Sequence, residues 1–278
     1  MRVFIFGSRG MAGHIIKDYF RKETDYDIFS SSRENEQKKN HYKVDVLNTE
    51  KVNRVLDEVQ PNIIINCIGI LNDNAEQHPK TAYKVNGVFP HRLAQWANEN
   101  DAKVIQMSTD CVFKGDKGNY VETDQPDGIT SYALSKRLGE LIDTQHITIR
   151  TSIIGPEIKR NGIGLFHWFM KQKGIVNGFK NVRWNGITTL QLAKVIHAMI
   201  IENGSGLYHI TAPNPITKYN LLKMIQSIFH KNDVVILPVN TPVLDRTLKT
   251  IRKDIHYQIP NYETMLMELK EWMNSHEN

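Results

Sequence analysis

Met1-Arg-Val-Phe-Ile-Phe6, followed by Gly7-Ser-Arg-Gly10-Met-Ala-Gly13, is the stretch that decides the fold. The apolar run is short and typical of a strand, and it breaks at once into glycines and then into a helical pattern that continues to Phe20. This order predicts a buried strand, a tight turn and a helix. A strand and a helix joined in this way are typical of a parallel sheet covered by helices.

The glycines have the spacing G-x-x-G-x-x-G rather than G-x-G-x-x-G. Glycines after a first strand let the backbone approach a pyrophosphate closely, and the helix N-terminus adds N–H donors and positive partial charge. A glycine triplet alone is a weak signal, but its place between a strand and a helix is the context that a dinucleotide site requires. The sequence therefore predicts a dinucleotide cofactor bound by Gly7, Gly10, Met11 and Gly13.

The end of the second predicted strand, residues 27–30, distinguishes the two nicotinamide cofactors. An acidic side chain at this place would bind the ribose 2′-hydroxyl of NAD, but the chain reads Ser30-Ser-Ser-Arg33. Hydroxyls and an arginine suit the extra phosphate of NADP, and Arg9 in the glycine loop can reach the same phosphate. The alternative is that both arginines are merely solvated. We expect NADPH rather than NADH, with contacts from Arg9, Ser32 and Arg33.

Tyr132 and Lys136 stand four residues apart in Ser131-Tyr-Ala-Leu-Ser-Lys136, which puts both side chains on one face of a helix. A phenol has a reference pKa of about 10, and an ammonium beside it favours the phenolate and lowers that pKa. Such a tyrosine can donate a proton to a carbonyl oxygen that receives hydride. The pair alone occurs by chance on many solvated helices. Thr109, at the end of the strand predicted before it, adds a hydroxyl that can donate to the same oxygen.

Strand and helix alternate between the glycines and residue 150. We predict strands that end at residue 46 and that cover 62–69, 104–108 and 147–151, and helices over 49–59, 75–98 and 132–144. Such alternation predicts a parallel sheet with helices on both faces. The fold class is therefore α/β, a Rossmann-like doubly wound sheet, and the residues of interest fall at strand ends, where ligands bind in such sheets.

The amino-acid composition changes after Gly155-Pro156, with more glycine, proline and aromatic residues. We predict a dinucleotide-binding domain over 1–152 and a smaller α/β substrate lobe over 153–278, and we leave open whether parts of the second half return to the first domain. Helices are expected over 189–202, 218–230 and 263–274, and strands over 207–211 and 234–237.

Composition excludes several classes of protein. The chain has 278 residues and a net charge of +5, but its basic residues are scattered among acidic ones, so we expect no nucleic-acid partner. The two cysteines, Cys67 and Cys111, lack the spacing of a zinc site or a disulfide framework, and the histidines show no ligand spacing, so no metal is expected. No apolar run approaches about 18 residues. We expect a cytoplasmic protein without a membrane partner.

Taken together, these features resemble the extended short-chain dehydrogenases/reductases. Within that superfamily, Ser108-Thr-Asp-Cys-Val-Phe-Lys-Gly115, Ser131-Tyr-Ala-Leu-Ser-Lys136 and Arg150-Thr-Ser-Ile-Ile-Gly155 resemble the dTDP-4-dehydrorhamnose reductase family, and the resemblance extends from Gly7 to Asp245-Arg-Thr-Leu248. It implies that Thr109, Tyr132 and Lys136 are catalytic and that Lys136 also holds the nicotinamide ribose. It further implies cofactor contacts from Asp45, Val46, Cys67, Ile68, Gly69 and Asn86.

The substrate contacts expected from the same resemblance are Ser108, Asp110, Cys111, Trp184 and Arg246. Arg246 suits a diphosphate and Trp184 a stacked ring, with a surface ion pair and a core tryptophan as the alternatives. Asp110 suits a cap or a hydrogen bond to the loop backbone better than it suits a general base. Cys111 stands where this branch commonly has a tyrosine, which leaves the substrate open, and where related 4,6-dehydratases have a glutamate, which disfavours dehydration.

These residues predict an NADPH-dependent reductase of the 4-keto group of a dTDP- or UDP-linked 6-deoxyhexose, acting in surface polysaccharide synthesis. One alternative is a nucleotide-sugar epimerase of the same fold. Another is a non-catalytic NADP-binding regulatory subunit, since the regulatory subunit of methionine adenosyltransferase resembles the same branch. The sequence does not distinguish UDP from dTDP, a 2-acetamido from a 2-hydroxy sugar, or the stereochemistry of the product. A homodimer is likewise left open.

Overall fold

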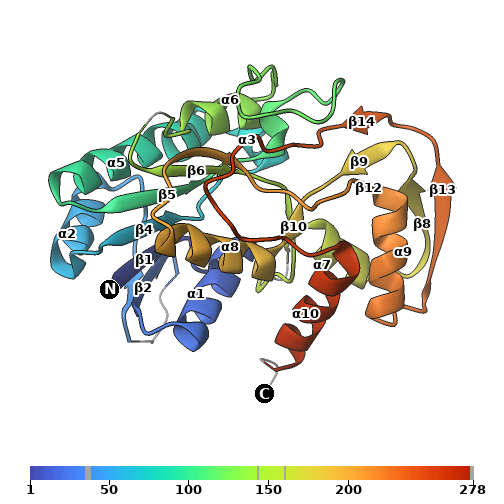
Figure 1. Ribbon diagram of the computed structural model, residues 1–278, viewed down its shortest axis with the longest axis horizontal. Coiled ribbons are helices and arrows are strands. Elements are labelled where there is room, and N and C mark those ends of the chain that lie inside the picture. Colours follow the sequence, from blue (N-terminus) through green and yellow to red (C-terminus); the bar gives the residue numbers. More distant parts are fainter. Residues whose placement is uncertain (35–38, 143, 160, 276–278) are drawn as a thin grey trace.

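A seven-stranded parallel sheet forms the centre of the molecule, with strand order β11-β6-β5-β4-β1-β2-β3 (Figure 1). The computed structural model describes residues 1–34, 39–142, 144–159 and 161–275. The predicted α/β class and Rossmann-like sheet are confirmed. The strands are β1 (Arg2–Phe6), β2 (Asp27–Ser32), β3 (His41–Lys43), β4 (Ile63–Asn66), β5 (Lys103–Met107), β6 (Ile147–Arg150) and β11 (Gly206–His209).

Helices cover both faces of this sheet. On one side lie α1 (Met11–Glu23) and α8 (Thr189–Ile201), and on the other α2 (Thr49–Val59), α5 (Phe89–Glu99) and α6 (Ser131–Leu138) (Figure 1). Spacing explains why α2 packs as it does, since its buried residues recur at helical intervals: Val52, Val55, Leu56 and Val59. Its N-cap, Asn48, accepts a hydrogen bond from the Lys51 N–H at 2.9 Å.

The predicted helix over residues 75–98 is wrong as a single element. The chain instead forms α3 (Asn72–Gln77), α4 (Pro79–Ala82), a π-helical turn η1 (Tyr83–Val88) and then α5. Pro79 follows a non-helical His78, and proline, which lacks an N–H and restricts the residue before it, begins a helix but does not continue one. The π-turn adds a residue to the helical repeat and is a feature that often occurs at functional sites.

The helix predicted over residues 132–144 ends early, at Leu138. Gly139 follows, and a Cβ atom there would lie 1.9 Å from the Asn86 carbonyl oxygen, so only glycine permits this contact between α6 and η1. The short α6 is therefore held against the π-turn. Residue 143 lies outside the described residues.

Smaller elements make up the second lobe, on the right of Figure 1. β8 (Gly174–Phe179) pairs with β13 (Val234–Val239) in parallel, and β9 (Val182–Trp184) lies between β12 (Ile216–Thr217) and β14 (Leu244–Asp245). β7 (Ile153–Ile154) pairs with β10 (Ile187–Thr188). The remaining elements are the 3-10 turn η2 (Asp110–Val112) and the helices α7 (Leu165–Lys171), α9 (Lys218–Ile228) and α10 (Tyr262–Asn274).

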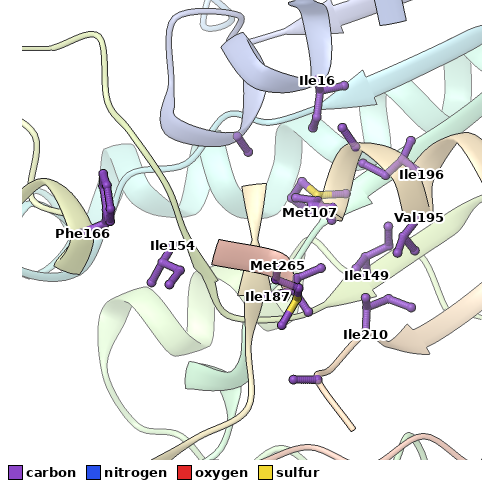
Figure 2. Packing of buried hydrophobic residues seen from close by; sticks show 14 of the residues in the cluster. Ile16, Met107, Ile149, Ile154, Phe166, Ile187, Val195, Ile196, Ile210 and Met265 are labelled. Carbon is purple, nitrogen blue, oxygen red and sulfur yellow. The ribbon is translucent and has the colours of Figure 1, made fainter. Parts of the chain in front are cut away.

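One hydrophobic core joins the sheet to the second half of the chain. Figure 2 shows Ile16 and Met107 near Ile149 and Ile196, with Met265 beside Ile187, and all of them belong to a single buried cluster. β11 pairs with β6 although it follows residue 153, so the second half contributes to the main sheet. The domain boundary near residue 152 stays a prediction. Among the described residues, none of the helices combines the length and apolarity that crossing a membrane would take.

Candidate active site

A cleft runs along the carboxyl ends of the central strands. The residues predicted as cofactor contacts that line it are Gly7, Arg9, Gly10, Ser32, Arg33, Asp45, Val46, Cys67, Ile68 and Gly69. Sequence reasoning missed several others, namely Glu34, Val44, Leu47, Ile70, Thr81, Val85 and Lys159. Parallel strands end at one edge of the sheet, and so residues far apart in the chain meet there.

The glycine loop has the geometry of a pyrophosphate cradle. The N–H groups of Gly7 and Ser8 both donate to the Ser31 carbonyl oxygen, at 3.1 and 3.0 Å, which holds the loop on β2. A Cβ atom on Gly13 would lie 2.3 Å from the Gly7 carbonyl oxygen, so the first turn of α1 packs directly on the loop. No side chain caps α1, and its first turn contains no acidic residue. Its N–H groups therefore fit an anionic ligand.

The far end of the cleft contains charges of both signs. An Arg9 Nη2 lies 3.0 Å from Glu34 Oε2, and the Ser32 hydroxyl donates to the Glu34 carbonyl oxygen at 2.8 Å. Arg33 is exposed beside them. Glu34 was not predicted as a site residue, although its place directly after Arg33 was a signal. An anion bound here would compete with Glu34 for Arg9, because both would be acceptors for the same guanidinium.

Asn86 holds the loop after β4. Its side chain accepts from the Ile70 N–H at 2.8 Å and donates to the Ile70 carbonyl oxygen at 2.9 Å and to the Ser135 hydroxyl at 3.0 Å. The amide thus joins the Cys67 to Ile70 loop to α6. Both its oxygen and its nitrogen form hydrogen bonds with other protein groups. A Cβ atom on Gly69 would lie 3.7 Å from Lys136 Nζ, so this loop lies next to the lysine.

Thr109, Tyr132 and Lys136 converge at the end of β5. The Thr109 hydroxyl donates to Asp110 Oδ1 at 3.1 Å, and a hydrogen bond between Thr109 and Tyr132 contributes to the pKa of the phenol. Lys136 Nζ donates to the Met107 carbonyl oxygen at 2.6 Å. Thr130 caps α6 by accepting from the Ala133 N–H at 3.1 Å, which fixes the start of the helix that presents both other side chains.

The protonation of Tyr132 and Lys136 differs from the sequence expectation. Burial, with the nearby Cys111 and Asp110, raises the pKa of Tyr132, whereas the hydrogen bond with Thr109 lowers it. Burial lowers the pKa of Lys136 to about 8, against the opposing charges of Glu140 and Cys67. We expected the ammonium to lower the phenol pKa, but in this structure it bonds to a backbone oxygen instead. The phenol is therefore protonated at neutral pH, which suits a proton donor.

Two of the predicted substrate residues have other partners in the structure. The Ser108 hydroxyl donates to Glu140 Oε1 at 2.7 Å, within a buried ion pair between Glu140 and Arg150. Trp184 is only 4% exposed, and its Nε1 donates to the Ser152 hydroxyl at 2.8 Å. Its ring belongs to the core, which was the alternative given for it above.

Asp110, Cys111 and Arg246 lie together beside the catalytic residues. Arg246 Nε donates to the Phe113 carbonyl oxygen at 2.9 Å, and its Nη1 lies 3.6 Å from Cys111 Sγ. Burial raises the pKa of Asp110, with the positive charges of Arg246 and Lys218 opposing it. Burial and the Asp110 charge raise the pKa of the Cys111 thiol to about 12, so this thiol is protonated at neutral pH.

Sequence reasoning missed Lys218. Its Nζ lies 4.7 Å from the centre of the Trp184 ring, and its charge acts on Asp110 and Cys111. Burial lowers the pKa of Lys218 to about 8, against those two opposing groups. Lys218 is the first residue of α9, and only the packing of the second lobe on the first brings it here. No local sequence signal predicts such a contact.

The sheet, the glycine loop and the cleft at the strand ends define a protein of the dinucleotide-binding Rossmann class. Residues 1–254 match the family model described as the RmlD substrate binding domain, and the chain belongs to that family. The family agrees with the resemblance drawn from the motifs around Thr109, Tyr132 and Arg150.

The chain is similar to three curated relatives and to one solved structure. It is 33% identical over 144 residues to the "Probable low-salt glycan biosynthesis reductase Agl14" of Haloferax volcanii, covering 50% of this chain and 48% of that relative, about half its length. It is 25% identical over 231 residues to the dTDP-4-dehydrorhamnose reductase of Aggregatibacter actinomycetemcomitans, covering 79% and 76%. Over 262 residues it is 24% identical to methionine adenosyltransferase 2 subunit beta of Danio rerio, covering 86% and 77%.

The solved structure is that of dTDP-4-dehydrorhamnose reductase from Bacillus anthracis in complex with NADP. It superposes with a TM-score of 0.83 at 24% identity, covering 98% of this chain and 99% of that one. This likeness shows a shared fold over nearly the whole chain.

Proposed function

We propose that the protein reduces the 4-keto group of a nucleotide-linked 6-deoxy sugar with NADPH. The observation that carries this proposal is the convergence of Thr109, Tyr132 and Lys136 at the end of β5, next to the cleft that begins at the glycine loop. A protonated phenol beside a hydroxyl is a suitable donor set for a ketone oxygen. Relatives named as dTDP-4-dehydrorhamnose reductases support the same reaction class.

The cleft fits a dinucleotide. Uncapped N–H groups of α1 would hold the pyrophosphate, and glycine at position 13 lets the first turn of this helix pack directly on the loop. Arg9 and Arg33 would hold the extra phosphate of NADPH, because guanidinium groups bind phosphate in bidentate fashion. Lys136, next to Gly69, would hold the nicotinamide ribose. When bound, the reduced nicotinamide supplies the hydride.

The chain's own residues account for the proton. Tyr132 donates its phenolic proton to the ketone oxygen as hydride reaches the carbon, and the Thr109 hydroxyl polarises that oxygen. In the structure the Lys136 ammonium donates to the Met107 carbonyl oxygen, and it would stabilise the phenolate that remains by turning to Tyr132, because an adjacent positive charge favours the charged form. The raised pKa of Tyr132 fits this direction of transfer, since a phenol that holds its proton at neutral pH can give it up only to a developing alkoxide.

An absorbance assay tests the proposal. Purified protein is mixed with NADPH and, in parallel, with dTDP- and UDP-linked 4-keto-6-deoxyhexoses, and the loss of reduced nicotinamide is followed. Oxidation with one of them is expected and names the nucleotide. Absence of oxidation with both, although NADPH binds, would contradict the proposal. A role in surface polysaccharide synthesis is part of the proposal and fits the glycan biosynthesis named for the Haloferax volcanii relative.

The likeness to methionine adenosyltransferase 2 subunit beta supports a second candidate, an NADP-binding regulatory subunit. Stable co-purification with a synthetase, without turnover of any keto sugar, would favour it. Product at unchanged redox level, with cofactor that stays bound, would instead favour an epimerase. The hydrogen-bonded set of Thr109, Tyr132 and Lys136, in which Thr109 and Lys136 are buried, favours the reductase.

A further inference from the structure

Lys218 shares its nearest carboxylate, Asp110, with a second cation. Within the described part of the chain, no hydrogen bond or ion pair joins its Nζ to another group, and this atom lies 4.7 Å from the centre of the Trp184 ring. The side chain is only half-buried, so a ligand can reach it. Taking an ammonium partly out of water costs free energy unless an anion or a dipole offsets it.

The charges around Lys218 do not balance. Asp110 is the carboxylate on which the charges of both Lys218 and Arg246 act, and Cys111, the other group that influences Lys218, is a protonated thiol at neutral pH. Two cations therefore face one carboxylate beside Thr109 and Tyr132. The surplus positive charge therefore lies beside Asp110, the residue that follows Thr109.

Arg246 already forms hydrogen bonds with other protein groups. Its Nε donates to the carbonyl oxygens of Phe113 and Lys114, at 2.9 and 3.2 Å, and its Nη1 contacts Cys111 Sγ. These bonds hold the turn that follows Thr109. Among the described residues Lys218 has no such bonds, and its Nζ lies over the face of the Trp184 ring, an uncharged partner that leaves the ammonium able to bind an anion.

We propose that Lys218 binds the diphosphate that links the sugar of the substrate to its nucleoside, while Arg246 acts by positioning the Asp110 to Lys114 turn. This inference rests on the proposed function and names the residue that recognises the charged part of the substrate. A diphosphate lies one bond from the sugar ring, so a cation beside the catalytic residues is placed to bind it. An ammonium acts on it as a point charge.

Binding of nucleoside diphosphates tests the inference without catalysis. Calorimetric titrations with dTDP and UDP are made on the NADPH-loaded protein, and the tighter one is used with Lys218→Met, Lys218→Arg and Lys223→Met. Lys223 lies exposed on the same helix, and its Nζ donates to Gln226 Oε1 at 3.0 Å, so it is the matched control. Lys218→Met is expected to weaken binding about 10- to 100-fold, as for loss of a close charge contact.

The other variants keep this result interpretable. Lys218→Arg retains the charge and should bind within about threefold of the wild type, and Lys223→Met should be unchanged. Thermal melting and NADPH affinity verify that each variant is folded. Lys218→Met that binds the diphosphate as the wild type does, or a wild type that binds neither diphosphate, would overturn the inference.

A carboxylate on the sugar is the other source of such an anion. UDP-glucose and UDP-glucuronate separate the two sources: weakened binding of both by Lys218→Met supports the diphosphate, and weakened binding of UDP-glucuronate alone overturns it. Failure of the inference is distinct from failure of the proposed function. Keto-sugar reduction that persists with unchanged KM in Lys218→Met overturns only the former, whereas diphosphate binding without any NADPH oxidation contradicts only the latter.

Discussion

Tyr132 keeps its proton mainly because burial disfavours the charged phenolate. Burial, the Cys111 thiol and the Asp110 carboxyl all disfavour the phenolate. A developing alkoxide on the substrate is a much stronger base than water, so transfer becomes favourable only as hydride arrives. The phenol of Tyr132 therefore stays protonated until hydride reaches the substrate.

Tyr132→Phe removes this proton while keeping the ring. Turnover of the keto sugar should fall by about 10²- to 10⁴-fold, the usual contribution of a general acid, with NADPH affinity unchanged. NADPH oxidation and fluorescence titration measure the two effects. Tyr42→Phe is the control, because the Tyr42 hydroxyl donates to Glu58 and Tyr42 is not one of the residues that line the cleft. Turnover within threefold of the wild type would remove Tyr132 from the proton-transfer step.

Lys136 predicts a pH dependence of turnover. Burial lowers the pKa of its ammonium to about 8, so the positive charge is present below that pH and lost above it. A neutral lysine cannot stabilise the phenolate, and kcat at saturating substrate and NADPH should therefore fall as pH rises through about 8. Initial rates from about pH 6 to about pH 10 check this. A kcat that rises across this range would contradict it.

At the scale of elements, the Glu140 to Arg150 pair joins α6 to the sheet. Arg150 Nε and Nη2 donate to the two carboxylate oxygens of Glu140, each at 2.7 Å, and Ser108 donates to the same carboxylate. The pair is buried, so each charge depends on the other for its partner. It fixes α6, with Tyr132 and Lys136, relative to the end of β5.

Glu140→Gln should destabilise the protein by about 3–5 kcal/mol, because it leaves the Arg150 charge buried and unpaired. Urea unfolding measures this loss. Glu268→Gln provides the comparison, since the Lys194 to Glu268 pair has side chains that are 26% and 32% exposed. That substitution should cost less than about 1 kcal/mol. Equal losses for the two variants would mean that burial does not set the strength of the inner pair.

The sequence predicts those elements whose bounds depend only on residues within the same segment. The helix over residues 49–59 was predicted with the bounds that the structure has, because its cap and its apolar spacing lie within the segment. The single helix predicted over 75–98 is wrong because Pro79 begins a new helix and because the chain forms a π-turn where it packs on α6, a segment distant in the sequence. In the same way, the cleft-lining glycines were predictable from their motif, whereas Lys218 and Lys159 depend on how the two halves pack.

At the scale of the whole molecule, the two halves share one core. α8 packs on α1, and β11 completes the main sheet beside β6. Residues 1–152 alone would therefore expose the apolar face of α1 and one edge of β6. Because this surface is extensive, we expect the two halves to unfold together.

A fragment of residues 1–152 should show no cooperative thermal transition and no NADPH binding, whereas the full chain should show a single transition that coincides by circular dichroism and fluorescence. A longer fragment that ends at residue 212 restores both α8 and β11 and should regain NADPH affinity. A cooperative transition in the short fragment would support a domain that ends at residue 152 without later segments returning to it, one of the two possibilities that the sequence leaves open.

The place of β11 in the sheet also constrains the order in which the chain can mature on the ribosome. β6 is finished at Arg150, but the strand that covers its outer edge is not made until residues 206–209 emerge. During that interval the open edge presents unpaired N–H and C=O groups that can pair with another nascent chain. Slow synthesis between β6 and β11 should therefore favour aggregation, and the risk ends once β11 has docked.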